Sequence, residues 1–195
     1  MNITPPDWAE ALLRICLRPD EVDAVSGDLL EEYRDHVRPK YGQHRADRWY
    51  TIQVLGFVWR GTRLWAALFG AAFVVRTALD WFAPVQQFET RSAVSSALGV
   101  AILLAAGGWS AWRSGSVAAG TMVGVATTAL GAVVSISAVV ALLAVWHDPE
   151  TMAAIRGSGG LSEALTLPVM MVLPGIVIGT IGGAVGATVK RLQSA

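Results

Sequence analysis

The sequence predicts a mainly α-helical membrane protein in which a small cytoplasmic three-helix head precedes a bundle of four transmembrane helices. Hydrophobic residues make up 53% of the 195 residues, a high share for a water-soluble protein. Charge is unevenly distributed, because residues 1–63 carry nine Lys/Arg and ten Asp/Glu whereas residues 64–195 carry six and five. We therefore expect a cytoplasmic helical domain at 1–60 and a transmembrane domain at 61–195.

Two short helices are predicted in the head. The first begins after Pro5-Pro6 and ends near Pro19, because the residue before a proline is disfavoured in the α conformation. The second begins with Asp20 as its N-cap and ends before Gly42. Each carries an apolar stripe at helical spacing: Trp8, Leu12, Ile15 and Cys16 on the first, and Val22, Val25, Leu29, Tyr33 and Val37 on the second.

A third helix is expected to begin between His44 and Asp47 and to continue into the first membrane span. Two short helices alone bury little apolar surface, so we expect both to pack against this third one. Tryptophans and arginines are interspersed along residues 45–63, a composition typical of the boundary between a cytoplasmic domain and a bilayer.

Four membrane spans are predicted, at residues 64–82, 94–112, 117–146 and 165–189. Basic residues exceed acidic ones before the first span, in the turn after the second and in the carboxy-terminal tail, whereas the connection between the third and fourth spans is acidic. The positive-inside rule then places both termini in the cytoplasm. Aromatic residues at the ends of the spans agree with this placement: Trp59, Trp65, Trp81, Phe82, Trp109, Trp112 and Trp146.

Glycines four residues apart mark one face of each of the last two spans. Such spacing lets helix backbones approach closely in lipid. The faces serve either packing among the four helices or contact with a second copy or another membrane protein, and the sequence leaves both uses open. The glycines concerned are Gly120 and Gly124 in the third span and Gly175, Gly179 and Gly183 in the fourth.

Arg76 and Asp80 are the ionisable residues inside the predicted spans, and they lie four apart on one face of the first. A charge at the bilayer centre costs on the order of 2.5–3.5 kcal/mol on insertion scales, but this intramembrane polar pair lies near the outer end and can pair there. It is either a structural interfacial pair or a functional polar patch. The other three spans lack ionisable residues, which argues against a proton relay.

The second head helix is expected to expose an acidic face. A basic surface on a partner protein would complement this face, although a solvated acidic face is the simpler interpretation. A metal site at Asp28, Glu32 and His36 is not favoured, because one helix face rarely completes a coordination sphere. We predict neither a metal nor a cofactor. The predicted partner-binding residues are Asp28, Glu31, Glu32, Tyr33 and Asp35.

Several classes of protein are not favoured by the sequence. A net charge of zero gives no reason to expect nucleic-acid binding. The single cysteine, Cys16, excludes an internal disulfide and is expected to be a small core residue. Phosphate-binding loops, zinc-protease helices and serine-nucleophile elbows are absent from the sequence, so we predict that the protein is not an enzyme.

The amino-terminal third resembles the permease prefix domain, which is found ahead of macrolide-exporter-like ABC permeases in Acidobacteria and related bacteria and in small stand-alone membrane proteins. The resemblance covers residues 4–60 and implies a cytoplasmic helical module at a bacterial inner membrane. No stretch long enough to form a periplasmic domain follows, unlike in the permeases. The matching features are Pro5-Pro6, Trp8-Ala9, Leu12-Leu13, Gly27-Asp28-Leu29, Glu31-Glu32-Tyr33 and Arg48-Trp49-Tyr50.

Taken together, these features predict an accessory or regulatory subunit embedded in the bilayer, whose head docks a membrane or cytoplasmic protein, with a permease as one such partner. The alternative is a small transporter or channel that works as a homo-oligomer, with Arg76 and Asp80 near its outer mouth. A membrane enzyme is the third interpretation, but no residue is identified as its nucleophile or base.

Overall fold

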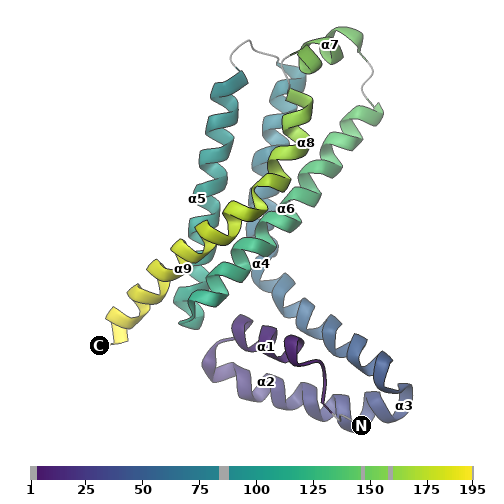
Figure 1. Cartoon of the computed structure of the whole chain (residues 1–195), viewed down its shortest axis with the longest axis vertical. Helices are drawn as coiled ribbons and strands as arrows, with labels where there is room; N and C mark the ends of the chain where they lie inside the picture. The colour runs from purple at the N-terminus through teal and green to yellow at the C-terminus, as the bar shows by residue number, and fades with distance from the viewer. Residues whose placement is uncertain (1–3, 84–87, 146–147, 158–159, 195) are drawn as a thin grey trace.

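The computed structural model describes residues 4–83, 88–145, 148–157 and 160–194, and every regular element among them is helical. Figure 1 shows the long helices rising side by side above a smaller group of helices formed by the amino-terminal residues. In chain order the elements are α1 (Asp7–Cys16), α2 (Pro19–Glu32), the π-helical turn η1 (Tyr33–Val37), α3 (Arg38–Tyr41), α4 (Gln43–Phe82), α5 (Phe88–Ser114), α6 (Val117–Val145), α7 (Pro149–Gly157), α8 (Gly160–Met170) and α9 (Val172–Ser194).

The amino-terminal elements pack against the first half of α4 around one apolar cluster. Its fully buried members come from α1, η1 and α4, and the apolar residues of α2 cover it from below. On α1 the buried residues are Ala9 and Leu13, and Leu12 packs against the cluster, whereas Trp8 is 55% exposed. The buried face is therefore shifted by one residue from the predicted stripe. The cluster consists of Ala9, Leu13, Tyr33, Val37, Ala46, Tyr50 and Val54.

The ends of the short helices follow from proline and glycine. The N-cap of α2 is Arg18 rather than the predicted Asp20, because Pro19 occupies the first helical position, where its missing N–H has no helical partner to lose. Gly42 ends α3 with a φ of 78°, a left-handed conformation that suits glycine. The chain reverses there and enters α4.

Four helices are long and apolar enough to cross a membrane. The predicted continuity of the third helix with the first span is confirmed, since α4 runs unbroken for 40 residues. The predicted fourth span at 165–189 is not one continuous helix, because the helix is interrupted at Met171. Among the described residues, the long apolar helix in this region is Val172–Gln193. Pro174 lacks the N–H that would bond the Met170 carbonyl, which disfavours a continuous helix there.

Two predicted loops also differ from the structure. The connection predicted at 83–93 is shorter, because α5 begins at Phe88. The connection predicted at 147–163 contains α7 and the first turn of α8. Trp146, placed by the sequence at the outer interface, lies outside the described residues.

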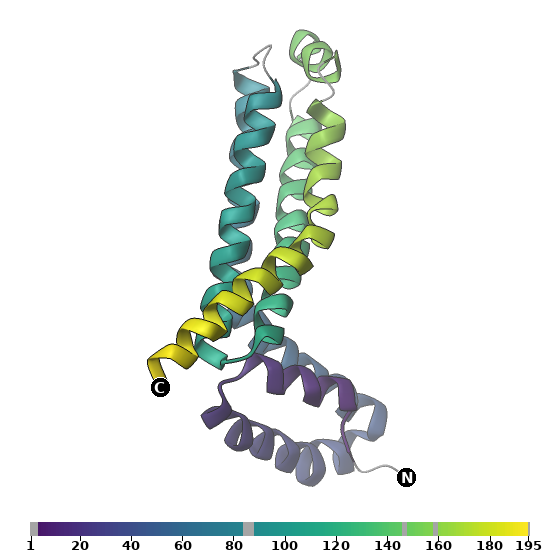
Figure 2. The same ribbon diagram turned by 60° about the vertical axis from the view of Figure 1, so that its left-hand side comes forward.

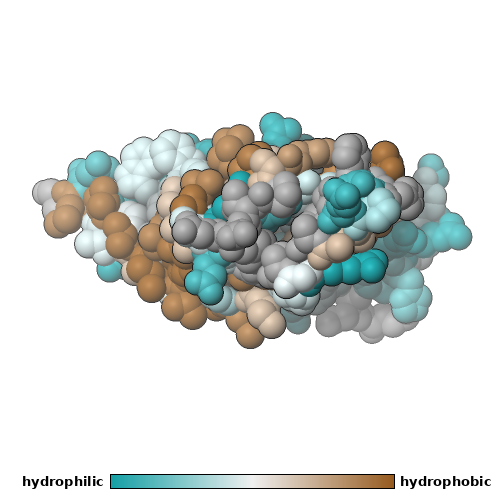
Figure 3. Space-filling model, turned by 90° about the horizontal axis from the view of Figure 1, so that it is seen from above, coloured by the Kyte–Doolittle hydropathy of each residue, from teal (hydrophilic) through white to brown (hydrophobic). Residues whose placement is uncertain are grey.

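The bundle packs α9 across α5 and α6, with α4 on the other side of α6 (Figures 1 and 2). A buried apolar cluster in the bundle joins Phe69, Phe73, Leu103 and Met171. Apolar side chains cover much of the flank in the view from the α7 end (Figure 3). Helix α1 and the end of α9 lie at the same end of the bundle in both ribbon views.

Candidate interaction surface

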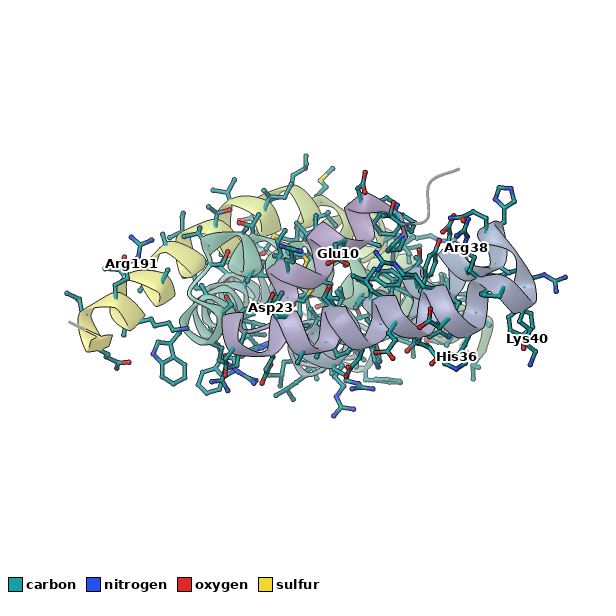
Figure 4. The ribbon with its side chains drawn as sticks, turned by 90° about the horizontal axis from the view of Figure 1, so that it is seen from below. Glu10, Asp23, His36, Arg38, Lys40 and Arg191 are labelled. Carbon is teal, nitrogen blue, oxygen red and sulfur yellow. The ribbon has the colours of Figure 1, made fainter. Side chains whose placement is uncertain are left out.

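Helix α2 forms the outermost layer of the lower end of the molecule, on the side of α1 away from the bundle (Figures 1 and 2). Seen from below, it lies nearest the viewer and runs from the region of Asp23 towards His36, while the end of α9 with Arg191 extends beyond it (Figure 4). The predicted acidic residues Asp28, Glu31, Glu32 and Asp35 are all exposed. Asp28, Glu31 and Glu32 share one face of α2, because their spacing of three and four residues is close to the helical repeat, and Asp35 follows them in η1. The name "acidic face" refers below to these four residues.

Tyr33 needs a correction, because it is fully buried and does not belong to the acidic face. Its hydroxyl donates to Asp47 Oδ1 at 2.6 Å and accepts from Gln43 Nε2 at 2.6 Å. Burial, together with the hydrogen bond to Asp47, raises the pKa of Tyr33 to about 12, so the hydroxyl keeps its proton at neutral pH. Tyr33 therefore anchors η1 to the start of α4 and cannot contact a partner directly.

A second buried polar network holds α1, α2 and α4 together around Glu10. Ser26 Oγ donates to Glu10 Oε1 at 2.6 Å, and Tyr50 Oη donates to Glu10 Oε2 at 2.5 Å. Burial raises the pKa of Glu10, but the hydrogen bonds from Ser26 and Tyr50 and the positive charge of Arg14 outweigh it, so the pKa lies below its ordinary value. Glu10 is thus a carboxylate at neutral pH, and its charged form supports the position of α2.

The sequence alone does not predict this network. Glu10 and Tyr50 are 40 residues apart, and their pairing depends on how α1 packs on α4. The sequence offers one indication of this network: Glu10 lies at the edge of the apolar face of α1, next to the buried Ala9 and close to Leu13. A charged residue at the edge of an apolar helix face needs a hydrogen-bond partner when the helix packs.

The glycines of the predicted packing faces all lie buried between α6 and α9 of the same chain. A Cβ atom added at Gly124 would lie 2.5 Å from the Gly175 carbonyl oxygen, and one added at Gly120 would lie 2.6 Å from Gly183 Cα. Gly179 likewise meets Gly120 and Gly124. Of the two uses left open by the sequence, the structure shows packing within the bundle.

Arg76 and Asp80 are brought together, and a third residue joins them. Arg76 Nε lies 3.5 Å from Asp80 Oδ2, and Arg91 Nη1 of α5 lies 3.2 Å from Asp80 Oδ1. Arg91 also donates to the Leu79 carbonyl at 2.8 Å. Asp80 is therefore held between two guanidinium groups, and the cluster fastens the end of α4 to the start of α5. The sequence predicts that Arg91 lies in the connection between the first two spans, and this prediction does not link it to the pair.

Neither the metal-ligating residues of the second head helix nor Cys16 forms a reactive site. Glu32 and His36 lie 3.3 Å apart as an exposed pair, and no group of three metal-ligating side chains occurs among the described residues. Cys16 is half-buried, with its Sγ 3.7 Å from Met122 Sδ of α6. Burial raises the pKa of the Cys16 thiol to about 12, which leaves little reactive thiolate at neutral pH.

No model of a known protein family, no curated protein and no solved structure matches this chain. The resemblance of residues 4–60 to the permease prefix domain therefore stays a prediction. What the described residues themselves offer is an exposed acidic face on α2, held in place by two buried polar networks centred on Glu10 and Tyr33.

Proposed function

We propose that this chain is a multi-pass membrane protein whose amino-terminal helices dock a protein partner at the cytoplasmic side, in the role of an accessory or regulatory subunit. The observation that carries the proposal is the acidic face, whose four residues are exposed on the helical layer that lies furthest from the bundle. A face of this charge suits a partner that presents lysines and arginines, because complementary potentials steer association.

The distribution of charge supports the cytoplasmic placement. Both α1 and the end of α9 lie at one end of the bundle, which fits an even number of spans. Basic residues gather at this end of the spans, among them Arg60, Arg63, Arg113, Lys190 and Arg191. Under the positive-inside rule this end faces the cytoplasm, and the resemblance to the prefix domain makes a bacterial inner membrane the proposed location.

The bundle supports an accessory role more than transport. Its glycine faces are occupied by contacts within the chain, so they do not supply the oligomer interface that a small channel would need. Asp80 is paired on both sides by arginines, which favours a structural role for that cluster. Flux into proteoliposomes is the measurement that separates the two functions: the accessory role predicts none, whereas transport predicts flux that Arg76→Ala reduces.

The direct test is co-purification of the tagged full chain from native membranes with cross-linking, followed by mass spectrometry. We expect stoichiometric recovery of a membrane or cytoplasmic protein, with a permease as the first partner to look for. Glu31→Lys should reduce recovery, while Asp23→Lys, an exposed carboxylate of the same helix outside the acidic face, should not. Equal recovery with Glu31→Lys and with the unsubstituted chain would exclude the acidic face as the docking surface.

A further inference from the structure

A basic hollow of about 620 Å³ lies where the amino-terminal helices meet the bundle. This size is within the range of small-ligand sites in proteins. Arg18 at the start of α2, Arg60 of α4 and Arg113 at the end of α5 contribute its positive charges, and Glu21 is its one acidic residue among those described. The hollow thus gathers charges from three elements that are far apart in sequence.

Its positive charge is only partly neutralised within the protein. Arg18 is paired with Asp20 at 3.0 Å and with Glu21 at 3.8 Å. Among the residues that the structure describes, no carboxylate lies within ion-pair distance of the Arg60 or Arg113 guanidinium. Arg60 instead lies over the Phe57 ring, at 5.5 Å from its centroid. Two arginines therefore remain available to an anion.

The hollow continues into an apolar groove on the surface of the bundle. Trp65 and Trp109 line both the basic hollow and the groove, so the two adjoin. Beyond these tryptophans the groove runs between α5 and α9, along residues such as Val185 and Val189. Trp109 is 52% exposed, with its indole open to the surroundings.

The ends of α5 and α9 that border the groove are fixed by side-chain hydrogen bonds. Lys190 Nζ donates to the Arg113 carbonyl at 2.8 Å, and Trp112 Nε1 donates to Gln193 Oε1 at 3.0 Å. Lys190 also lines a smaller hollow that shares Arg18, Trp109 and Arg113 with the basic one. Lys190, Arg18 and Arg113 thus lie beside the groove, where the hydrogen bonds from Lys190 and Trp112 hold α5 and α9 together.

We propose that this junction binds an anionic phospholipid, with its phosphate between Arg60 and Arg113 and one acyl chain along the groove between α5 and α9. Basic pockets between membrane helices on the cytoplasmic side suit anionic head groups, and tryptophan suits the boundary between head groups and hydrocarbon. The apolar groove selects a lipid over a soluble phosphate, because a soluble anion would leave the groove unfilled. The inference rests on the membrane placement proposed above, in which α4, α5 and α9 lie in lipid.

A bound lipid would contact both α4 and the α1–α2 connection. Arg18 lines the hollow and is the N-cap of α2, the helix that carries the acidic face. A lipid in the hollow would therefore join the start of α2 to the bilayer. This arrangement makes the position of α2 sensitive to anionic lipid, which gives the proposed docking unit a link to membrane composition.

The test is native mass spectrometry of the detergent-purified full chain, titrated with phosphatidylglycerol or with phosphatidylcholine. We expect one phosphatidylglycerol to be retained in preference to phosphatidylcholine. The variant Arg60→Gln with Arg113→Gln should lose this preference, by about fivefold for each arginine, since a basic residue near an anionic surface contributes about 1 kcal/mol. Its matched control is Arg45→Gln with Arg48→Gln, which removes two exposed charges of α4 outside the hollow and should bind like the unsubstituted chain.

Equal retention of the two lipids would overturn the lipid site, and so would an unchanged preference in the Arg60/Arg113 variant. Displacement of phosphatidylglycerol by inorganic phosphate alone would also overturn it, because it would indicate that the site binds a soluble anion. Circular dichroism and gel filtration establish that each variant is folded. The membrane placement fails separately, if a carboxy-terminal tag is labelled from outside intact cells. If the tag faces the cytoplasm but the unsubstituted chain retains the two lipids equally, the lipid site is overturned and the membrane placement is not.

Discussion

Tyr50 Oη donates a 2.5 Å hydrogen bond to Glu10 Oε2, which joins the first helix of the chain to the helix that leads into the bundle. Tyr50 is fully buried, and its ring packs edge-on against Tyr33 with the centroids 5.9 Å apart. The two tyrosines therefore connect both buried polar networks, one through Glu10 and the other through Asp47. The position of α2, and with it the acidic face, depends on these contacts.

Tyr50→Phe should loosen the amino-terminal helices while leaving the bundle folded. The substitution keeps the ring but leaves Glu10 Oε2 without its donor, and the loss of a hydrogen bond to a charged group costs about 1.5–3 kcal/mol. Hydrogen exchange followed by mass spectrometry should show faster exchange in α1 and α2. The control is Tyr41→Phe, because Tyr41 is 48% exposed. Equal exchange in the two variants would contradict a stabilising role for the bond.

The stability of the amino-terminal helices should fall in acid because of Glu10. Its pKa is lower in the folded protein than the ordinary 4.5, so its contribution is present above that value and is lost as the pH falls through the folded pKa. We expect the urea midpoint of this region to decrease below pH 4.5. In Glu10→Gln the midpoint should be lower at neutral pH and should change less with acid. Parallel pH profiles for the two proteins would rule out Glu10 as the source.

Gly124→Ala should destabilise the bundle. The added Cβ would lie 2.5 Å from the Gly175 carbonyl oxygen and 2.9 Å from Gly179 Cα, so α6 and α9 must move apart. Overpacking of this kind costs about 1–3 kcal/mol, which should lower the thermal midpoint in detergent. Gly56→Ala in α4 is the control, because its added Cβ has nothing within 4 Å besides its chain neighbours and the nearby backbone of α4, and alanine favours a helix. A midpoint unaffected by Gly124→Ala would mean that the helices are not closely packed there.

The features predicted correctly from the sequence were those set by local chemistry. Apolar length located the helices that can span a bilayer, and the absence of a strong breaker predicted the continuity of α4. Glycine spacing identified the contact between α6 and α9, because a close backbone approach leaves no room for a Cβ. The break at Met171 lies between Pro168 and Pro174, and two prolines so close together do not fix by themselves the residue at which a helix is interrupted.

The features missed depend on contacts between distant parts of the chain. Helical spacing placed Tyr33 in the apolar stripe of the second helix and also next to the acidic residues. Its burial follows from the packing of η1 on α4, which the spacing does not show. Arg91 and Asp80 meet because α5 begins earlier than hydropathy suggested. The basic hollow likewise combines Arg18, Arg60 and Arg113 from three elements, and no spacing in the sequence relates them.

Asp80→Asn should weaken the contact between α4 and α5. Asp80 and Arg76 have side chains only 11% and 4% exposed, and removal of one partner from a buried ion pair costs about 3–5 kcal/mol. Arg91 is 22% exposed and can turn towards solvent, so the lower end of this range is expected. The thermal midpoint in detergent should fall accordingly.

A double-mutant cycle with Arg91→Gln isolates the part of this effect that belongs to the contact between helices. If Asp80 and Arg91 stabilise one another, the double variant should be less destabilised than the sum of the single variants, by about 0.5–3 kcal/mol. Additive effects would show that the 3.2 Å contact contributes no net stability. Asp80 would then act through Arg76 alone, and the end of α4 would be held to α5 by the bond from Arg91 to the Leu79 carbonyl.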